Sequence, residues 1–377
     1  MSARLSGYYF LSFAFVGVFA PYFALYLHDA GSSARDIAIL MAVMQSMRLF
    51  GPYLWGTAVD KGLPPKQAIG LTALGGACGL LAFMLGEGFA GMLLGMTILA
   101  LFWNGAPALL ETLTFDHLRE RATHYGPIRT WGSLGFVAAV LAMGQLLERH
   151  STGIVPWACW VILLGLLLLS FALPDAPCRP RAATSMPVFK TMLAKPVVAA
   201  TLAAGFLMAA AHGALNVFYT IHLSQHGYGA SAIGILWALG VAAEIAIFMA
   251  MPRLDRLFAP RLLLAACFAA AIVRFTLIGW WVSSIFVAVF AQLLHALSFG
   301  AHHTVSVSAV NRGFASGNHA KGQALYASCY GAGTLAGGLA SGFLWAPLGS
   351  SWTFGIGSIF AFAGMVVIML FMYEEKK

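Results

Sequence analysis

Gly56-Thr-Ala-Val-Asp60-Lys61-Gly62-Leu-Pro-Pro-Lys66 is a short polar stretch between two long apolar runs, and it decides the fold. Its glycine, the aspartate four residues later and the following basic residues form a pattern suited to a turn at a membrane surface. The Asp60 carboxylate, near a helix end, can pair with basic loop residues such as Lys61 and latch one conformation. A degenerate copy, Leu254-Asp255-Arg256, holds the same place in the second half. We predict conformational latches at Asp60–Lys61 and Asp255–Arg256; solvated turns with ordinary membrane-side charges are the alternative.

Apolar runs of similar length continue through the whole chain. Of its 377 residues, 60% are hydrophobic and 9% are charged, whereas soluble globular proteins carry about 25% charged residues. This composition excludes an ordinary cytosolic enzyme, a nucleic-acid binder and a single-pass receptor. At roughly 20 residues per helix and about a dozen per loop, the length predicts an all-α membrane protein with twelve transmembrane helices. The spanning stretches lie at 7–27, 37–58, 67–86, 89–112, 126–147, 154–173, 197–222, 231–251, 261–280, 282–310, 322–345 and 352–373.

A segment rich in proline and basic residues, 174–196, divides these spans six and six. We predict an N-terminal six-helix bundle at 1–173, a cytoplasmic linker at 174–196 and a C-terminal six-helix bundle at 197–377. The halves also repeat, since a shift of 196 residues places Gly31 on Gly227 and Gly126 on Gly322. Glycines recurring at one offset indicate the same close helix contacts in both halves. Such a pseudo-symmetric repeat, with a substrate site near the bilayer midplane, is typical of secondary transporters.

The basic residues predict the orientation. Those outside the spans fall mostly on one side of the predicted membrane, with Arg35 and Arg149 on the other. By the positive-inside rule, the crowded side is cytoplasmic and holds both termini and the linker. The net charge of +8 thus follows from topology and needs no nucleic-acid partner. We expect a monomeric multi-pass protein surrounded by lipid in a bacterial inner (plasma) membrane.

Five charged residues lie inside the predicted spans: Arg48, Glu111, Arg129, Glu244 and Arg274. A charge within the bilayer is costly unless it is paired or faces a wet cavity. The 196-residue shift places Arg48 on Glu244, which predicts an ion pair across a central cavity. Three cations and two anions leave one positive charge, which a monoanionic substrate would balance. The alternative is an arginine bound to backbone carbonyls or to water.

One face of the predicted tenth span gathers Gln292, His295, Phe299, His302 and His303. A cluster of histidine, glutamate and arginine can take up and release a proton near neutral pH; structural histidines are the alternative. His302 and His303 are adjacent and therefore diverge, and the cysteines show no metal-binding spacing. We therefore expect neither a metal nor a cofactor. His212, in the seventh span, is interpreted as a packing residue or a helix–helix hydrogen bond.

Four segments resemble a known family. They are Arg48-Leu-Phe-Gly51, Tyr125-Gly-Pro-Ile-Arg129-Thr-Trp131-Gly-Ser133, Ala232-Ile-Gly-Ile-Leu-Trp237-Ala-Leu-Gly-Val-Ala-Ala-Glu244, and Val273-Arg274 followed by Leu294-His295 and His303. The chain resembles, from end to end, the phenylpropionate permease family of the major facilitator superfamily, which is related to the lactose permease group. The resemblance implies the major facilitator fold and an aromatic carboxylate substrate.

The comparison with the lactose permease group also assigns roles. A glutamate and an arginine that bind the galactoside there match Glu111 and Arg129, and its ninth-span arginine and tenth-span histidine match Arg274 and His295. The tenth-span lysine and proton-carrying glutamate of that group, however, fall at Gln292 and Ser298. The proton site therefore is not a copy, and Glu244 becomes the candidate carrier.

We accordingly expect a proton-coupled importer of a small organic anion that works by alternating access. Arg129 is expected to bind the substrate carboxylate, because a planar guanidinium fits it bidentately. Glu111 is expected to orient Arg129 or to bind a substrate hydroxyl. The aromatic residues Tyr22, Trp103, Trp131 and Trp237 offer flat apolar surface to a substrate, with packing as the alternative. Proton coupling is assigned to Glu244, tuned by Arg48, Arg274, His295 and His303.

Other functions stay open on the sequence alone. A proton-coupled sugar or nucleoside symporter is supported by the match at Glu111 and Arg129, and efflux of a hydrophobic compound is a third possibility. An intramembrane enzyme would need an acid–base or nucleophile motif, and the chain has no HExxH, GxSxG or P-loop pattern. A sensor without transport would need a signalling module, and the loops are short. We therefore predict a transporter and not an enzyme.

Overall fold

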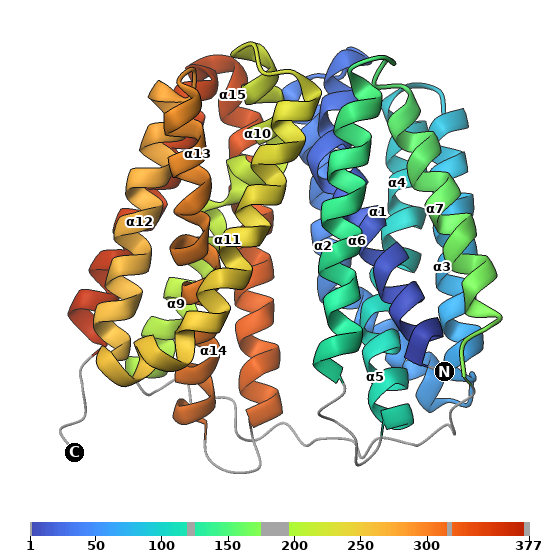
Figure 1. Ribbon diagram of the computed structural model, residues 1–377, viewed down its shortest axis with the longest axis horizontal. Coiled ribbons are helices and arrows are strands. Elements are labelled where there is room, and N and C mark those ends of the chain that lie inside the picture. Colours follow the sequence, from blue (N-terminus) through green and yellow to red (C-terminus); the bar gives the residue numbers. More distant parts are fainter. Residues whose placement is uncertain (1, 119–124, 175–195, 315–318, 373–377) are drawn as a thin grey trace. The chain divides into compact units, whose positions relative to one another are not determined.

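The computed structural model describes residues 2–118, 125–174, 196–314 and 319–372, and within them it contains helices and no strands (Figure 1). In the first half the helices are α1 (Ser2–Asp29), α2 (Ala34–Asp60), α3 (Pro65–Leu85), α4 (Gly88–Trp103), α5 (Ala106–Leu118), α6 (Tyr125–Leu147) and α7 (Ile154–Ser170). The predicted linker, 174–196, falls almost entirely outside the described residues.

The second half interrupts two of its spans. Its helices are α9 (Pro196–Ala211), α10 (Gly213–Gln225), α11 (Ala230–Leu257), α12 (Pro260–Trp281), α13 (Ile285–Leu293), a π-helix (Ala296–Ala301), α14 (His302–Gly313) and α15 (His319–Phe371). His212 separates α9 from α10, and α15 is two helices joined at Gly349, whose φ is 80°. With α15 counted as two and α7 included, the described residues hold the twelve apolar spans that the sequence predicts.

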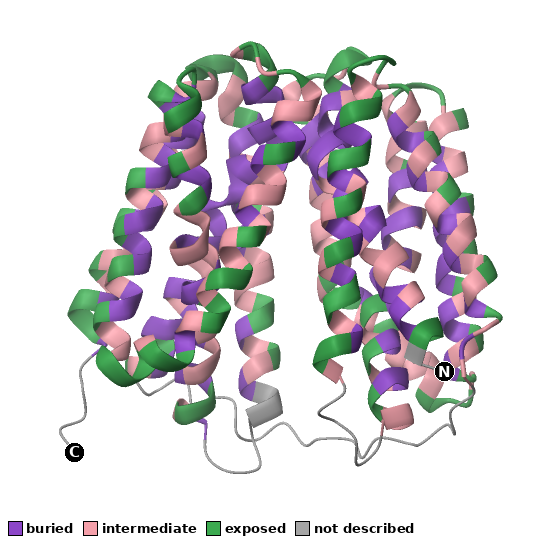
Figure 2. Ribbon diagram, viewed as in Figure 1, coloured by how far each residue is buried: buried purple, intermediate pink, exposed green. Residues whose placement is uncertain are grey.

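Helix ends follow from local chemistry. At α2, the Ser33 hydroxyl accepts a hydrogen bond of 3.1 Å from the backbone N–H of Asp36, which satisfies a donor that the first turn leaves unpaired. Both α3 and α12 begin with a proline in the first turn, at Pro65 and Pro260, where the missing N–H costs nothing. Exposed residues occur on many of the helices (Figure 2). Many of them are large and apolar, as lipid contact requires.

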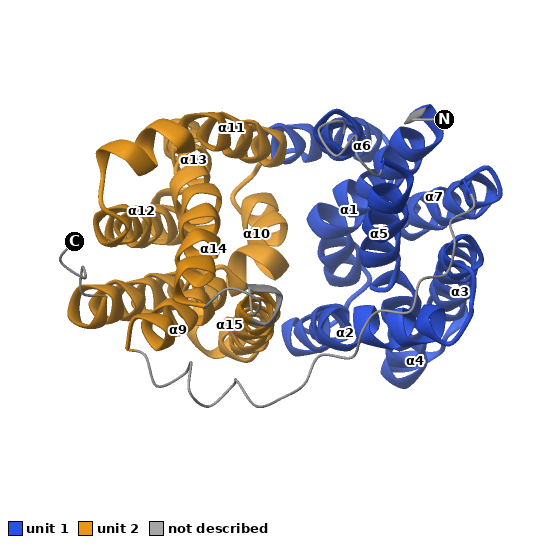
Figure 3. Ribbon diagram, turned by 90° about the horizontal axis from the view of Figure 1, so that it is seen from below, with its two compact units in different colours: residues 1–183, 229–235 blue, residues 184–228, 236–377 orange. Residues whose placement is uncertain are grey.

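The chain forms two compact units (Figure 3). Unit 1 contains residues 1–183 and 229–235, and unit 2 contains residues 184–228 and 236–377. The start of α11 therefore clusters with the N-terminal helices, whereas the rest of this helix belongs to unit 2.

Glycine contacts repeat between the units. In unit 1, a Cβ added to Gly17 of α1 would lie 2.6 Å from the Phe136 carbonyl oxygen of α6. In unit 2, a Cβ added to Gly213 of α10 would lie 2.1 Å from the Gly337 carbonyl carbon of α15. Gly17 and Gly213 are 196 residues apart, so the predicted repeat places equivalent glycines at equivalent helix crossings. Only a residue without a side chain permits this approach.

The outer turns repeat as well. Gly31 lies in the turn after α1 and Gly227 in the turn after α10, with φ of 86° and 85°. In both turns the following N–H bonds back five residues, from Ser32 to the Leu27 carbonyl and from Tyr228 to the Leu223 carbonyl, at 3.0 and 3.1 Å. This is a Schellman motif, and its left-handed residue favours glycine. The 196-residue shift therefore reproduces backbone conformation.

A third repeated feature is a helix irregularity. The break between α4 and α5 falls at Asn104, and the same shift leads to Gly300 in the π-helix. A Cβ on Gly51 of α2 would meet the Asn104 Cβ at 3.1 Å, and a Cβ on Gly300 would meet the Ile247 side chain of α11 at 2.6 Å. Gly51 and Ile247 are themselves 196 residues apart. The same helix crossing therefore occurs in both units. In unit 1 the glycine belongs to α2, and in unit 2 it belongs to the π-helix that faces α11.

Candidate functional site

Unit 2 holds a buried cation at its centre. Arg274 of α12 is 1% exposed, and its Nη1 donates to Nδ1 of His295 at 3.0 Å, Nε2 of His212 at 3.2 Å and Oγ of Ser298 at 3.2 Å. Its Nη2 donates to Oε1 of Gln292 at 3.0 Å. All four acceptors are neutral groups, and within the described residues no carboxylate lies within ion-pair distance of this guanidinium.

The hydrogen bonds fix the tautomers of two histidines. An arginine N–H can only donate, so His212 Nε2 and His295 Nδ1 must both accept with a lone pair. His212 Nδ1 lies 2.9 Å from the Met208 carbonyl oxygen and therefore carries the proton. The proton of neutral His295 is then on Nε2, which lies 3.7 Å from Oε2 of Glu244. His295 thus stands between a cation and a carboxylate, and each ring nitrogen faces one of them.

Three rings on consecutive turns form a stack beside Glu244. The His295 and Phe299 ring centroids are 5.0 Å apart with an angle of 13°, and those of Phe299 and His303 are 6.4 Å apart with an angle of 10°. His303 is exposed. The side chain of Glu244 is 21% exposed and that of His295 is 16% exposed. Glu244 is therefore within reach of solvent, in contrast with Arg274.

His302 does not share the helical face of His295, Phe299 and His303, which corrects the sequence prediction that all of them lie on one face. His302 is 1% exposed and Gln292 is 2% exposed, whereas His303 is exposed. The π-helix Ala296–Ala301 lies between Gln292 and these histidines, and its wider turn shifts the register of everything beyond it. His302 consequently enters the core of unit 2, and His303 lies on the side of Glu244.

Both irregular spans of unit 2 lie at Arg274. One break places His212 against its guanidinium, and the π-helix contributes Ser298. In secondary transporters, interrupted helices near the midplane mark the sites of substrate and coupling ions. The backbone geometry therefore supports a functional role for this cluster independently of its residue types.

Unit 1 places its arginine differently. The Arg129 guanidinium of α6 lies over the Phe13 ring of α1, 4.0 Å from the centroid. The Glu111 carboxylate of α5 instead accepts a hydrogen bond of 3.2 Å from the Tyr125 hydroxyl, and the Tyr125 ring stacks on Phe115 at 4.5 Å. No ion pair joins Glu111 to Arg129 in the described part of the chain.

The candidate aromatic surfaces fall into two groups. Tyr22 is fully buried, and its hydroxyl donates to the carbonyls of Val140 at 2.9 Å and Ala230 at 3.3 Å. Its ring therefore serves packing and presents no face to a substrate in this conformation. Trp131 is 48% exposed. Trp237 is partly exposed, and its indole N–H donates to the Thr220 hydroxyl at 3.0 Å.

The predicted latch residues are exposed at helix ends. Asp60 and Lys61 end α2, and Asp255 and Arg256 lie in the last turn of α11. Arg256 donates to the Pro252 carbonyl of its own helix at 2.8 Å. Within the described residues, the carboxylates of Asp60 and Asp255 have no ion-pair partner, so the latches stay a prediction.

The predicted pair of Arg48 and Glu244 is also left as a prediction, because the two residues belong to different units. Arg48 donates to Oε1 of Gln45 within α2 at 3.3 Å.

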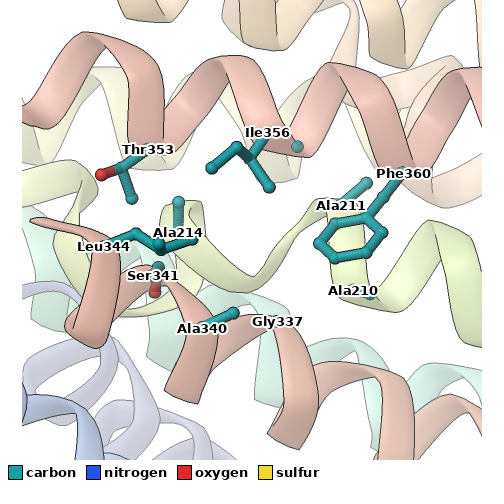
Figure 4. Close-up of a pocket in the computed structure, with 11 residues that line it drawn as sticks. Ala210, Ala211, Ala214, Gly337, Ala340, Ser341, Leu344, Thr353, Ile356 and Phe360 are labelled. Carbon is teal, nitrogen blue, oxygen red and sulfur yellow. The ribbon is translucent and has the colours of Figure 1, made fainter. Parts of the chain in front are cut away.

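A small pocket lies at the break between α9 and α10 (Figure 4). Its lining is mostly apolar, with Ala211, Ala214 and Phe360 among its walls. The hydroxyls of Ser341 and Thr353 already donate to carbonyls of their own helices. The pocket therefore offers no free polar group to a ligand, and it is a packing gap beside the helix break. In the described residues no group of histidine, cysteine and acidic side chains is arranged to hold a metal.

His212 was expected to pack or to form a helix–helix hydrogen bond, and it forms one, with Arg274 of α12. Sequence reasoning did miss Phe13 and Tyr125. Phe13 and Tyr125 gave no signal, because an aromatic residue in a span is usually packing. Tyr125 does lie at the start of the segment that carries Arg129, and this proximity is the only sequence hint of its role.

The helical fold and the similarity to known proteins together define a secondary transporter of the major facilitator type and not an enzyme. The chain belongs to the MFS_1 like family, whose pattern matches residues 2–356. It is 27% identical to the "Probable 3-phenylpropionic acid transporter" of Escherichia coli (strain K12), over 79% of each chain. It is 28% identical to the maltose permease of Geobacillus stearothermophilus, over 70% of this chain and 68% of that one. Its fold matches the crystal structure of the nucleoside transporter NupG with a TM-score of 0.83, 19% identity and 99% of each chain covered.

Proposed function

We propose that the protein is a proton-coupled importer of a small organic anion, an aromatic monocarboxylate, and that it works by alternating access as a monomer in the bacterial inner membrane with cytoplasmic termini. The observation that carries this proposal is the difference between the surroundings of Arg274 and those of Arg129. Arg274 is enclosed by neutral acceptors, whereas the Arg129 guanidinium rests on a ring and makes no hydrogen bond within the described residues.

Arg129 is the substrate cation in this proposal. A ring beneath the guanidinium attracts its charge but accepts no conventional hydrogen bond, so the N–H donors stay available. A carboxylate is the partner that fits two of these donors at once. Phe115 and Trp131, which are 46% and 48% exposed in the same unit, supply apolar surface for a ring. The relative in Escherichia coli supports this substrate class by its name.

Glu244 is the proton carrier in this proposal. Its carboxylate faces the N–H of His295, and Arg274 holds the opposite nitrogen of that ring. A second proton on His295 would have to displace Arg274 from Nδ1, so the carboxylate is the easier place for a proton to bind. Protonation removes the negative charge that holds His295 between the two groups. Protonation of Glu244 therefore favours the conformation in which this carboxylate has the higher affinity for a proton. The shift is set by the difference in proton affinity between the two conformations.

A proton-coupled sugar or nucleoside symporter is the second candidate. It is favoured by Glu111, whose carboxylate already accepts a hydroxyl, that of Tyr125, and a substrate hydroxyl has the same chemistry. The maltose permease and the nucleoside transporter among the similar proteins also favour it.

The test is thermal stabilisation of the purified protein by aromatic carboxylates, sugars and nucleosides, at acidic and at neutral pH. A ligand at a hundred times its dissociation constant adds about 2.7 kcal/mol to stability when it binds only the folded form. We expect aromatic carboxylates to raise the melting temperature, more at acidic pH, and Arg129→Ala to abolish the shift. Arg149→Ala, which removes an exposed arginine beyond the same helix, is the matched control and should keep it.

Stabilisation by sugars or nucleosides alone would reject the anion proposal and support the second candidate. The direction of transport needs a separate measurement. Proteoliposomes with an inward proton gradient should accumulate the stabilising ligand, and Glu244→Gln should abolish accumulation while leaving exchange of substrate between the two sides.

A further inference from the structure

A tyrosine of unit 1 makes the contacts that a phenol ligand would make. Tyr125, the first residue of α6, stacks its ring on Phe115 with 4.5 Å between centroids and an angle of 22°. Its hydroxyl donates to Oε1 of Glu111 at 3.2 Å. Glu111 and Phe115 are four residues apart on α5, so a carboxylate and a ring are neighbours on one face of that helix. This face therefore suits a flat ring that carries a hydroxyl.

The hydrogen bond between Tyr125 and Glu111 is long for its type. A hydroxyl that donates to a carboxylate usually approaches to about 2.5–2.7 Å, whereas this one stays at 3.2 Å. The Tyr125 ring is attached to the backbone of α6, which restricts how closely its hydroxyl can approach Glu111. A phenol that belongs to a ligand has no such attachment, so it can form the shorter and stronger bond.

These side chains are accessible. Phe115 is 46% exposed although Tyr125 stacks on its ring. Glu111 is also exposed, and Tyr125 itself is only partly buried. Displacing the Tyr125 hydroxyl from Glu111 therefore breaks one hydrogen bond and disrupts no buried core.

Two helices place Arg129 close to Glu111. On α6, Arg129 lies one turn beyond the tyrosine, and its guanidinium lies over Phe13 of α1 at 4.0 Å. Tyr9, one turn before Phe13 on α1, has its hydroxyl 3.4 Å from Oγ1 of Thr114. Thr114 lies three residues beyond Glu111, on the same face of α5. Along both α1 and α6, the residues that contact the two charged groups are thus one helical turn apart, about 5.4 Å. A ring between a carboxylate and a hydroxyl covers a distance of this order.

We propose that the substrate is an aromatic acid with a hydroxyl on its ring, and that Glu111 binds this hydroxyl in the place that Tyr125 holds in this conformation. This rests on the proposed function, in which Arg129 binds the carboxylate of the same molecule. Phe115 supports the ring between the two groups. Tyr125 then acts as an internal competitor, which keeps Glu111 paired until a substrate hydroxyl replaces it.

Matched ligands test the proposal on the unaltered protein. Titration calorimetry at neutral pH compares 3-phenylpropionate, the acid in the name of the Escherichia coli relative, with its ring-hydroxylated derivatives and their methyl ethers. A phenol keeps its proton at this pH, and a carboxylate can only accept a hydrogen bond, so the ether loses the contact. We expect the best hydroxylated acid to bind about tenfold more tightly than its ether.

The outcomes separate this proposal from the one on which it rests. If 3-phenylpropionate binds and the hydroxylated acids bind no more tightly than their ethers, the hydroxyl site is overturned and the proposed function stands. If no aromatic carboxylate binds, the hydroxyl site is overturned together with the proposed function.

Variants test whether Glu111 causes the preference. Glu111→Leu should make the hydroxylated acid and its ether bind equally, and a preference that survives this change overturns the proposal. Tyr125→Phe keeps the ring on Phe115 and removes the competing hydroxyl, so it should widen the difference between acid and ether by about 2- to 10-fold. An unchanged or smaller difference would show a purely structural bond and also overturns it. Asp116→Asn, which alters a partly exposed carboxylate on the same helix, is the control and should keep the original difference.

Discussion

Phe13 is the residue on which we expect the orientation of Arg129 to depend, because its ring centroid lies 4.0 Å from the guanidinium carbon. A cation–π contact contributes about 0.5–2 kcal/mol, depending on how far it is desolvated. Phe13→Leu should therefore weaken binding of the stabilising anion by roughly 2- to 30-fold. Phe10→Leu, a partly exposed ring on the same helix, should leave affinity unchanged. Equal affinities for the two variants, measured by titration calorimetry, would show that the ring does not position Arg129.

Gln292 gives a prediction about stability. Its Oε1 accepts from Nη2 of Arg274, and it is 2% exposed. Gln292→Leu leaves a buried charged donor without that partner, which costs about 1–3 kcal/mol and more for a charged group. The variant should unfold at a lower temperature than the parent protein. The exposed Gln225→Leu serves as control, and matching melting curves for the two variants would contradict the role of the Gln292 side chain.

At the scale of single residues, the sequence shows which charged side chains lie inside apolar spans, but it does not show what they contact. A charge inside an apolar run stands out in any reading, so Glu111, Arg129, Glu244 and Arg274 could all be found. Which side chains they contact depends on how each helix is rotated about its own axis, and the sequence does not show this. This is why Tyr125 and not Arg129 lies at Glu111, and why the described partners of Arg274 are neutral side chains.

The helix crossings at Gly17 and Gly213 predict matched behaviour in the two units. At either position a Cβ would lie within 2.6 Å or less of the facing backbone, and backbone cannot move aside as a flexible side chain does. Gly17→Ala and Gly213→Ala should each destabilise the protein by about 1–3 kcal/mol. Gly126→Ala provides the contrast, because a Cβ there meets nothing within 4 Å and alanine favours the helix. Thermal unfolding that ranks Gly126→Ala with the other two would contradict this packing.

At the scale of helices, span positions could be predicted and span interruptions could not. Hydrophobicity over about 20 residues locates a membrane helix whether or not it is continuous. The breaks at Asn104 and His212 and the π-helix at Ala296–Ala301 leave that signal unchanged. The prediction that the tenth span has one polar face failed for this reason, since it assumed a uniform turn between His295 and His302.

The orientation of the whole molecule is predicted by its basic loops. If the crowded side is cytoplasmic, a green fluorescent protein fused after Lys377 should fluoresce in a bacterial host, and alkaline phosphatase at the same place should be inactive. The complementary fusion after His150, between α6 and α7, should give active phosphatase. If the two reporters gave the reverse result at each position, the predicted topology would be upside down. If the same reporter were active at both positions, the number of spans between them would be wrong.

At the scale of the whole molecule, the sequence predicted the architecture because a repeat is read from spacing alone. The 196-residue offset, first seen in a few glycines, also holds for two Schellman turns and for one helix irregularity. The start of α11 was not predicted to cluster with unit 1. Apolar patterning shows where a helix runs, whereas the neighbours of each turn are set by side-chain contacts such as that of Tyr22 with the Ala230 carbonyl.

The crossing of α2 with Asn104 and that of α11 with Gly300 bear on how the two halves have diverged. If the two halves descend from one duplicated ancestor, an alignment of one half with the other pairs Gly51 with Ile247 and Asn104 with Gly300. Both aligned positions are then counted as mismatches. The contact itself is present in both copies, with the small residue exchanged between partners. This crossing therefore needs one small residue on either partner, and a column-by-column comparison of the halves counts two mismatches where the contact is kept.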